Sequence, residues 1–600
     1  MITLTALSTF LSKRRYLIYI LLAAAAAIPF LPSLFNGFVY DDREFFLTWE
    51  GIKHLRLDRI FLGDQPTGFH HVYRPVRNLF IVVLYSFLGS NAFAFHLISI
   101  IIHAINVMFI YTITKKIAPA SALIVSIVFA VMPIHVEAIN LIIAGTQAIG
   151  IAFFLLAFYT YIVYQESHKK TFFFISVAAA FIAYFTYEMT LTMPFLLILY
   201  DICIRDFRLM ELKKKFLTYA LYISGAIVFF IVRTLVLASA VKGSLLIPID
   251  FSIRMLTTTK ALLSYMYLTI FNWPLSAHHQ FDLSINFDRN VLMASIVLLF
   301  ILLLAGYLLK KRQRVYAFAI FWFFIALLPV LNIVQIASFV MEHYLYIASY
   351  GSALIFGTAL SYWNQSPKEN IRFAALCATI FLVFLFGTLT WQQSREWRTD
   401  ETLWLAALRQ EPHSTKAMTN LAVYYKEHGN LAKAENYLQR AANEQRGLAP
   451  ILMNFADLAL TEGRPNEAIS YLQQALSIKP QDPKIHNALG MAYSSIGDTA
   501  NAAKEFQAAI DVYPQFLEGI FNLAVMKLDQ KLWGEAILLF ERAKLLQPDS
   551  YEVYFGLAMA NFNLDQKIQA KEFAEQAIKL NPNFTPAKDL LKQIMQKLGS

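Results

Sequence analysis

The sequence has little cysteine and little charge. Only two of its 600 residues are cysteines, Cys203 and Cys377, and both lie in or at the edge of apolar segments. Two cysteines placed in this way give neither a disulfide framework nor the ligand spacing of a metal site. Charged residues make up 15% of the chain and hydrophobic residues 57%. That composition is too apolar for a soluble protein and predicts many membrane spans.

Several common catalytic motifs are also missing. The chain has no Walker loop, no Gly-x-Gly-x-x-Gly turn on a βαβ unit and no His-Glu-x-x-His helix. Nucleotide hydrolysis and zinc proteolysis therefore lose their usual sequence support, and we expect no metal and no firmly implied cofactor. The net charge of +10 does not indicate nucleic acid, because Lys and Arg cluster in short loops between apolar runs. That placement is the positive-inside pattern of membrane proteins.

Apolar runs fill the chain up to about Trp391. We expect eleven spans, at residues 16–35, 93–114, 120–132, 142–164, 172–187, 191–203, 216–237, 291–309, 316–336, 344–363 and 373–391. The first run is longer than a signal-peptide core and follows Lys13, Arg14 and Arg15, so we expect a retained span with a cytoplasmic N-terminus. Residues 253–271 are expected to be interfacial or re-entrant. If they crossed, the basic loop at 310–314 would fall outside the cell.

The part after Gln392 is polar, rich in alanine and repetitive. Small residues return every 34 positions, as at Ala434, Ala468, Ala502, Ala536 and Ala570. A period of 34 with small residues where two helices cross is the tetratricopeptide signature. We predict five repeats and a capping helix, on the extracytoplasmic side. Glycine ends the first helix of three repeats, whereas Lys531 and Asp565 take its place in the last two.

The predicted fold class is therefore all-α, a polytopic membrane helix bundle followed by an α-solenoid. We expect a membrane domain at residues 1–391, a linker helix at 392–413 and the repeat domain at 414–600.

Ionisable residues gather at the predicted outer ends of the spans. Asp41 and Asp42 follow the first span, and the same loop carries Tyr73, Arg74 and Arg77. The other candidates on this side are His135, Glu137, Glu188, Glu342 and His343, and two further candidates, His96 and His103, share one face of the second span. An ionisable group at a membrane indicates a functional site, although aspartate is also a common helix cap.

These residue types suit sugar transfer at a membrane surface. A carboxylate such as Asp41 or Asp42 can take the proton from an acceptor hydroxyl. A guanidinium such as that of Arg74 can hold a phosphate leaving group through paired hydrogen bonds. Structural explanations stay open, because Arg74 and Arg77 can reach lipid headgroups. The histidines His96 and His103 can bond between helices, and His135 with Glu137 can cap a span.

The chain resembles the transmembrane and tetratricopeptide-repeat protein O-mannosyltransferases and their bacterial relatives of the GT-C fold. The similar motifs are Phe38-Val-Tyr-Asp-Asp42, Tyr73-Arg-Pro-Val76, Phe95-His-Leu with Ile102-His-Ala-Ile-Asn106, Pro133-Ile-His-Val-Glu-Ala138 and Met341-Glu-His-Tyr-Leu-Tyr346. They occur in the family's order along nearly the whole chain. The sequence departs from the pattern at His343, where arginine is expected, at Ala348, where proline is expected, and at Gly145-Thr-Gln147.

The resemblance implies an inverting transfer of a sugar, usually mannose, from a polyprenyl-phosphate donor to Ser or Thr of an extracytoplasmic protein. It puts the base at Asp41, with Asp42 in support, and a multi-pass protein in a membrane. We favour the bacterial inner membrane over the endoplasmic reticulum. Two alternatives stay open: a transferase acting on an envelope lipid or glycan, and a non-catalytic membrane anchor for a repeat scaffold.

Three asparagines keep the repeat register on the first helices, Asn420, Asn454 and Asn522. Their carboxamides can donate to and accept from a peptide backbone without reading its side chains. We expect these positions to be exposed and to bind the acceptor polypeptide, although asparagine is also common at this position of the repeat.

Overall fold

The computed structural model describes residues 15–48, 52, 57–61, 72–207, 213–240, 249–336, 338–445 and 448–598, and every regular element within them is helical. The chain forms two compact units, one running to residue 412 and the other from residue 413. Lys13 and Arg14, which precede the first predicted span, lie outside the described residues.

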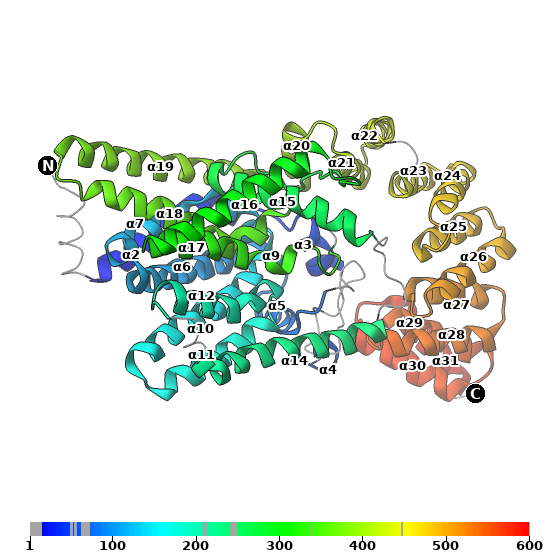
Figure 1. Ribbon diagram of the computed structural model, residues 1–600. Helices are drawn as coiled ribbons and strands as arrows, with labels where there is room; N and C mark the ends of the chain where they lie inside the picture. The colour runs from blue at the N-terminus through cyan, green and yellow to red at the C-terminus, as the bar shows by residue number, and fades with distance from the viewer. Residues whose placement is uncertain are drawn as a thin grey trace. The chain divides into compact units, whose positions relative to one another are not determined.

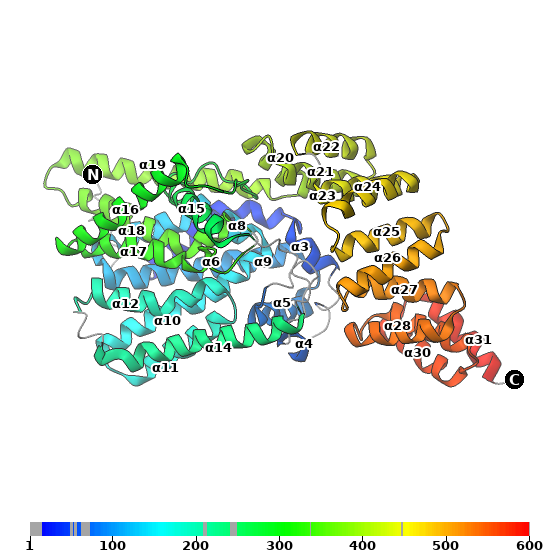
Figure 2. The ribbon, with the colours of Figure 1, turned by 45° about the vertical axis from the view of Figure 1, so that its right-hand side comes forward.

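The first unit is a bundle of helices. Figures 1 and 2 show its long helices running roughly parallel to one another. Their bounds up to residue 203 are α2 (Arg15–Ala27), α3 (Asp41–Arg43), α4 (Leu57–Phe61), α5 (Pro75–Leu88), α6 (Ala92–Ile117), α7 (Ala122–Val131), α8 (Val136–Asn140), α9 (Ile142–Gly145), α10 (Gln147–Ser167), α11 (Lys170–Tyr184) and α12 (Met193–Cys203). The later ones are α14 (Phe216–Ala240), α15 (Phe251–Phe271), α16 (Arg289–Lys310), α17 (Arg314–Ala326), α18 (Leu345–Asn364), α19 (Glu369–Glu396) and α20 (Asp400–Gln410).

Short 3₁₀ or π segments join several of these helices. They are η1 (Ile28–Phe35), η2 (Glu44–Thr48), η5 (Pro119–Ser121), η6 (Pro133–His135), η7 (Glu188–Thr192), η8 (Lys213–Lys215), η9 (Leu328–Val330) and η10 (Glu342–Tyr344). Several of them carry residues that the sequence marked as candidates.

Among the described residues, six segments are long and apolar enough to cross a membrane, or seven if the bent pair at 119–131 and 133–140 is one span. The six are Tyr16–Phe35, Ala92–Ile117, Ile142–Ser167, Phe216–Leu237, Arg289–Lys310 and Glu369–Glu396. The expected eleven spans are not confirmed. The other predicted runs are helical, but α11, α12 and α17 have only 15, 11 and 13 residues, and a span needs about 20. Several long apolar helices nevertheless fit a multi-pass membrane protein.

Residues 253–271, which we expected to be interfacial or re-entrant, form the continuous helix α15. This 21-residue helix is not one of the six segments above. It carries the threonines and basic residues that lowered its apolar character in the sequence.

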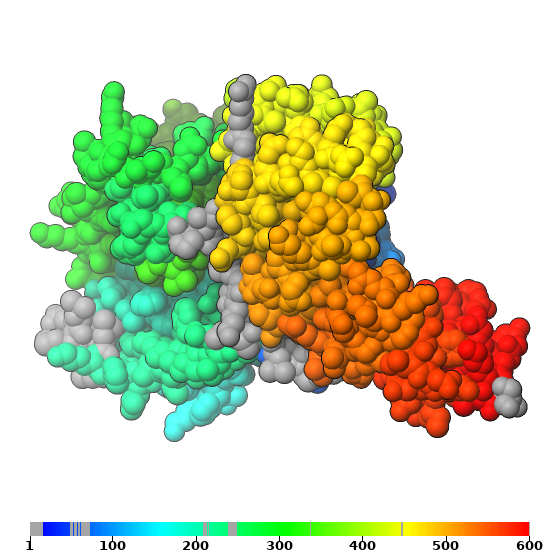
Figure 3. Space-filling view, turned by 90° about the vertical axis from the view of Figure 1, so that its right-hand side faces the viewer, coloured from blue at the N-terminus to red at the C-terminus, as the bar shows by residue number. Residues whose placement is uncertain are grey.

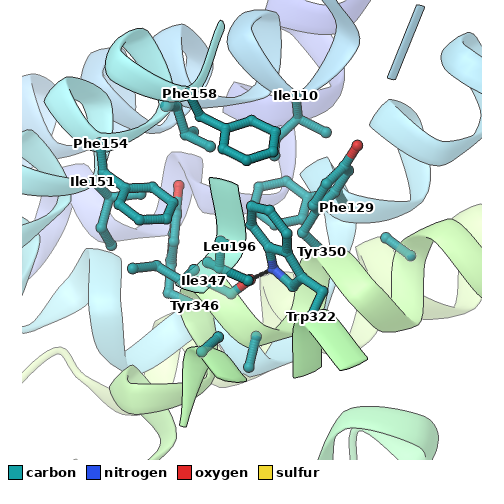
Figure 4. Close-up of a cluster of buried hydrophobic side chains, with 14 of the residues drawn as sticks. Ile110, Phe129, Ile151, Phe154, Phe158, Leu196, Trp322, Tyr346, Ile347 and Tyr350 are labelled. Atoms are coloured by element: carbon teal, nitrogen blue, oxygen red, sulfur yellow. Dashed lines mark hydrogen bonds between the residues drawn. The ribbon is translucent and has the colours of Figure 1, made fainter. Parts of the chain in front are cut away.

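The core of the bundle is aromatic, as Figure 4 shows. Trp322 of α17 is fully buried, and its indole N–H donates to the carbonyl of Ile347 at 2.8 Å. The ring lies edge-on to Phe158 of α10 at a centroid distance of 5.2 Å. Burying a large ring favours packing, and the indole N–H needs a partner once it leaves water. This one side chain therefore ties α10, α17 and α18 together.

The second unit is an array of paired helices with a final single helix. The pairs are α21 (Thr415–Glu427) with α22 (Leu431–Glu444), α23 (Ala449–Thr461) with α24 (Pro465–Ile478), α25 (Pro483–Ser495) with α26 (Thr499–Val512), α27 (Leu517–Asp529) with α28 (Trp533–Leu546), and α29 (Tyr551–Asn563) with α30 (Lys567–Leu580), followed by α31 (Thr585–Leu598). Figure 3 shows their surface passing from yellow to red in chain order.

Small buried residues let the paired helices approach closely. The alanines that recur every 34 residues, among them Ala468, Ala502 and Ala536, are fully buried. The turns that join the two helices of each pair differ in the free energy needed to form a positive φ. Gly429, Gly463 and Gly497 have φ between +72° and +78°, and Lys531 and Asp565 adopt +63° and +60° at the same places. Side chains rarely take that conformation, so the last two turns cost more to form.

Candidate functional site

Asp42 is a buried side chain that fixes the start of α9. Its two carboxylate oxygens accept hydrogen bonds from the backbone N–H groups of Ile142 and Ile143, each at 2.8 Å. The first N–H groups of a helix have no partner inside the helix, so the carboxylate satisfies two of them. Burial raises the pKa of Asp42 well above its usual range, and the two N–H donors lower it in part. Asp42 is thus held in place, and the half-buried Asp41 is the more accessible of the two.

Arg74 and Arg77 lie at the start of α5, three residues apart. The Nε of Arg74 donates to Glu188 at 2.6 Å, and its guanidinium lies 5.2 Å from the centre of the Tyr187 ring. This pairing unites Arg74 with Glu188, which lies 114 residues away in the chain.

Arg77 is almost completely buried, with 1% of its surface exposed. It donates from Nε and Nη2 to the side-chain oxygen of Asn78 and lies 5.0 Å from the Phe45 ring. Burial and the charge of Arg74 lower the pKa of Arg77, and the charges of Glu188 and Asp41 partly oppose this. Asp41 is therefore within electrostatic range of the Arg77 guanidinium. Tyr73, just before them, is buried and donates to the carbonyl of Phe61 at 3.0 Å.

Glu137 and His343 form a buried pair between segments 206 residues apart. Glu137 Oε1 lies 2.8 Å from His343 Nδ1, and its Oε2 accepts the backbone N–H of His343 at 2.9 Å. The side chains are 1% and 9% exposed. His343, which departs from the expected arginine, thus still places a hydrogen-bonding nitrogen against an acid. The pair therefore joins α8, which contains Glu137, to η10, which precedes α18.

Glu342, next to His343, faces a residue that we missed in the sequence. Its Oε1 accepts from the backbone N–H of Ser276 at 2.6 Å and lies 2.9 Å from Nε2 of His279. The other ring nitrogen of His279 is 3.7 Å from Glu411, at the end of α20. Burial raises the pKa of Glu342 to about 7, although His279 lowers it in part. In the sequence, the only indication of His279 is that two histidines, His278 and His279, stand side by side after the segment 253–271.

The three remaining histidines lie deeper in the bundle. His103 Nε2 is 3.1 Å from the carbonyl of Ala130, so this nitrogen carries the proton, and Nδ1 accepts from the hydroxyl of Tyr346 at 2.6 Å. His135 Nε2 bonds Ser349 at 2.8 Å. His96 is fully buried, and the described residues offer neither of its ring nitrogens a hydrogen bond. The geometry of His103 and His135 favours the interhelical explanation over direct contact with a substrate.

Two sets of charges occupy opposite ends of the same helices. The carboxylates and guanidiniums above lie near the start of α5, α12 and α18 and the end of α8. The basic pairs lie elsewhere: Lys116 with Glu166 at the ends of α6 and α10, and Lys215 with Asp201 where α14 begins. The 26-residue segment Ile142–Ser167 begins at the N–H groups that bond Asp42, ends beside Glu166 and is about 39 Å long. That length separates the two sets by roughly the thickness of a bilayer.

The asparagines of the repeats are half-buried, so our expectation of exposed positions is wrong for this array. Asn420 donates to the carbonyl of Lys416 on its own helix at 2.8 Å. Asn522 donates to the side chain of Asn487 on the preceding repeat at 2.9 Å. Close packing of consecutive first helices covers part of each side chain.

Among the described residues, no group of three or more His, Cys, Asp or Glu side chains could hold a metal ion.

Comparison with known proteins identifies the repeats. The tetratricopeptide repeat family matches residues 415–444, 459–524 and 551–584. The second unit is thus an array of tetratricopeptide repeats. Among solved structures, the tetratricopeptide-repeat protein YrrB is 15% identical, with a TM-score of 0.27 over 32% of this chain and 97% of that one.

Curated relatives are similar over a larger part of the chain. Protein O-mannosyl-transferase TMTC3 of Homo sapiens is 20% identical over 274 residues, which are 43% of this chain and 26% of the relative. Protein O-mannosyl-transferase Tmtc1 of Drosophila melanogaster is 23% identical over 312 residues, which are 42% of this chain and 36% of the relative. The matches span about a quarter to a third of these relatives. Over that part, this chain is thus similar in sequence to proteins named as O-mannosyl-transferases.

Proposed function

We propose that this protein is an integral-membrane glycosyltransferase that moves a sugar from a polyprenyl-phosphate donor to Ser or Thr hydroxyls of extracytoplasmic proteins. We propose mannose as the sugar, because the relatives are named as O-mannosyl-transferases. The observation that carries the proposal is the buried charge set beside the first span. The half-buried Asp41 lies within electrostatic range of the fixed Asp42 and of Arg77, and the Arg77 guanidinium in turn interacts with that of Arg74.

Asp41 is the proposed base. It takes the proton from the acceptor hydroxyl while that oxygen attacks the anomeric carbon of the sugar. The bond from that carbon to the phosphate oxygen breaks, and its electron pair leaves with the lipid phosphate. Attack on the face opposite the phosphate inverts the configuration at this carbon. Asp42 supports the step through position, since both of its oxygens accept backbone N–H groups of α9.

Arg74 and Arg77 are the proposed phosphate ligands. A guanidinium carries five N–H donors, and the ion pair with Glu188 uses the Nε of Arg74. Negative charge develops on the phosphate as the bond breaks, and a cation already fixed by Glu188 and Tyr187 stabilises it without reorganisation. The pairs of Glu137 with His343 and Glu342 with His279 shape the neighbouring part of the proposed donor site.

The repeat array is the proposed acceptor-binding part. Tetratricopeptide repeats stack helices into extended surfaces suited to polypeptides. Asn420, Asn454 and Asn522 occupy the same register position on the first helices of three repeats, at intervals of 34 and 68 residues. In this proposal they hold the acceptor backbone, while the membrane unit performs the chemistry.

We also propose the topology. The basic pairs and the charge set at Asp41 lie at opposite helix ends, which supports cytoplasmic basic loops and an extracytoplasmic site. The repeats then lie outside the cytoplasm, with the bacterial inner membrane favoured. Cysteine labelling from outside intact cells at residues 549–551 should succeed. Labelling only after permeabilisation would overturn the topology.

The test of function is a transfer assay with purified full-length protein, a polyprenyl-phosphate mannose and a Ser/Thr peptide. Asp41→Asn keeps the size of the side chain but removes its basicity, so transfer should fall about 10²–10⁴-fold. Asp206→Asn is the matched control, because this exposed aspartate pairs with Arg312 among the basic residues. Wild-type turnover in both Asp41→Asn and Asp42→Asn would show that the base lies elsewhere.

A further inference from the structure

Tyr40, directly before Asp41, has a backbone conformation that side chains rarely adopt. Its φ is 55° and its ψ is −127°. These angles belong to the second residue of a type II′ turn, a place dominated by glycine. The backbone N–H of Asp42 closes this turn on the carbonyl of Val39 at 3.1 Å. A strained residue persists only where its surroundings hold it, and such residues cluster at functional sites.

The surroundings that hold Tyr40 come from α20. The backbone N–H of Tyr40 donates to Asp400 Oδ1 at 2.8 Å, and Arg43 Nη1 lies 3.2 Å from Asp400 Oδ2. The Tyr40 ring meets Trp404 edge-on, with centroids 5.2 Å apart and planes at 88°. The carboxylate of Asp400 thus bonds the residues before and after the Asp41–Asp42 pair, although it lies about 360 residues away in the chain.

Asp400 is not needed to start its own helix. Thr399 caps α20 through a capping box with Thr402, so the first turn is satisfied without Asp400. Asp400 and Trp404 are four residues apart and therefore share one face of α20. They are 9% and 1% exposed. Just upstream, the carbonyl of Arg398 accepts the backbone N–H of Gly37 at 3.1 Å, so the segment meets the first loop at several points.

We propose that Asp400, supported by Trp404, is a positioning residue that sets the direction of Asp41 by holding Tyr40 in its strained turn. The inference rests on the proposed function of Asp41 as the base. The segment that the sequence presented as a linker helix thereby becomes part of the site. The peptide that carries Asp41 follows Tyr40 directly, so a change in the φ of Tyr40 re-aims the carboxylate.

The first arm of the test needs no activity. Hydrogen exchange of the full-length protein, followed by mass spectrometry, reports on the turn at residues 37–46. Asp400→Ala should speed exchange there, and Asp400→Asn should do so less, because its side-chain oxygen can still accept the Tyr40 N–H. Glu535→Ala is the control, since Glu535 is also a first-turn acid with a cationic partner, Lys527 at 2.7 Å. Exchange at 37–46 that is equal in all four proteins would overturn the proposal.

The second arm measures transfer. Asp400→Ala should lower kcat by roughly ten- to a hundredfold with the KM for the donor almost unchanged, since a misplaced group loses rate more than binding. Asp400→Asn should recover part of the loss. Glycine adopts a positive φ freely, so Asp400→Ala should cost less in a Tyr40→Gly background. Additive losses in this cycle would refute the positioning role. Should the wild-type protein transfer no sugar, the function fails, and the exchange arm alone decides the role of Asp400.

Discussion

The two units of this protein bury polar groups in opposite ways. In the membrane unit, charged side chains are buried as pairs that join distant parts of the chain, such as Glu137 with His343 and Arg74 with Glu188. In the repeat unit, the described ion pairs join residues no more than 31 positions apart, and most have at least one exposed partner, as with Lys527 and Glu535. About half of the buried hydrophobic residues there are alanines. A solenoid gains stability from repeated local contacts, whereas the bundle relies on particular long-range partners.

Removing a buried acid should test this contrast most severely. Glu137→Ala leaves His343 without its partner inside the bundle, and breaking a buried pair costs about 3–5 kcal/mol. In the repeat unit, Glu535→Ala removes an acid that is 56% exposed, and such pairs are worth about 0–1 kcal/mol. Unfolding of the two full-length variants, followed in detergent, provides the measurement. Equal losses would mean that the two units do not differ in this way.

In the repeat unit, we expect substitutions of the three asparagines to change the affinity for an acceptor peptide. Replacing Asn420, Asn454 and Asn522 together with alanine should weaken binding of a Ser/Thr peptide roughly tenfold or more, since each neutral hydrogen bond is worth about 0.5–1.5 kcal/mol. Fluorescence anisotropy with a labelled peptide measures this.

The control for the asparagine ladder is a second triple alanine variant. Asn443, Asn466 and Asn563 are exposed and stand outside the 34-residue register, so their loss should leave peptide binding unchanged. Two triple variants with the same affinity would contradict the proposed ladder.

The pH dependence of donor use should distinguish the two units as well. With its pKa raised to about 7 by burial, Glu342 is protonated below that pH and negatively charged above it. The added negative charge opposes a phosphate, so the KM for the donor should rise roughly three- to tenfold through pH 7, about 0.7–1.4 kcal/mol. Glu342→Gln cannot titrate and should flatten the profile. Glu444→Gln, at the exposed pair with His413, should keep it. A step at pH 7 in Glu342→Gln would assign it to another group.

The smallest effect concerns the turns of the repeats. Lys531→Gly and Asp565→Gly place glycine where φ is +63° and +60°, so each should stabilise the array by about 1 kcal/mol. Gly429→Ala, at a φ of +74°, should cost a similar amount. Thermal unfolding of the full-length variants measures both directions. No gain from Lys531→Gly would show that the lysine side chain compensates for its backbone.

Whether the sequence could indicate a residue of the candidate site depends on how far along the chain that residue's contact partner lies. The sequence indicated Asp41, Asp42, Arg74 and Arg77 as candidates, because ionisable groups are conspicuous after an apolar run. His279 and Asp400 were missed, because nothing near them in the chain marks their partners, 63 and 360 residues away. The partner of Glu188, Arg74, is likewise visible only in the structure.

By itself the sequence determined the all-helical class, the apolar character of the first part and the tetratricopeptide array. Helix formation, hydrophobicity and a 34-residue period are local properties, and each can be read in a window of tens of residues. The tertiary structure decided which candidates meet, that α20 joins the membrane unit and that His103 and His135 form hydrogen bonds inside the bundle. Those outcomes depend on how helices far apart in sequence pack, because a buried polar group takes whichever partner the packed neighbour supplies.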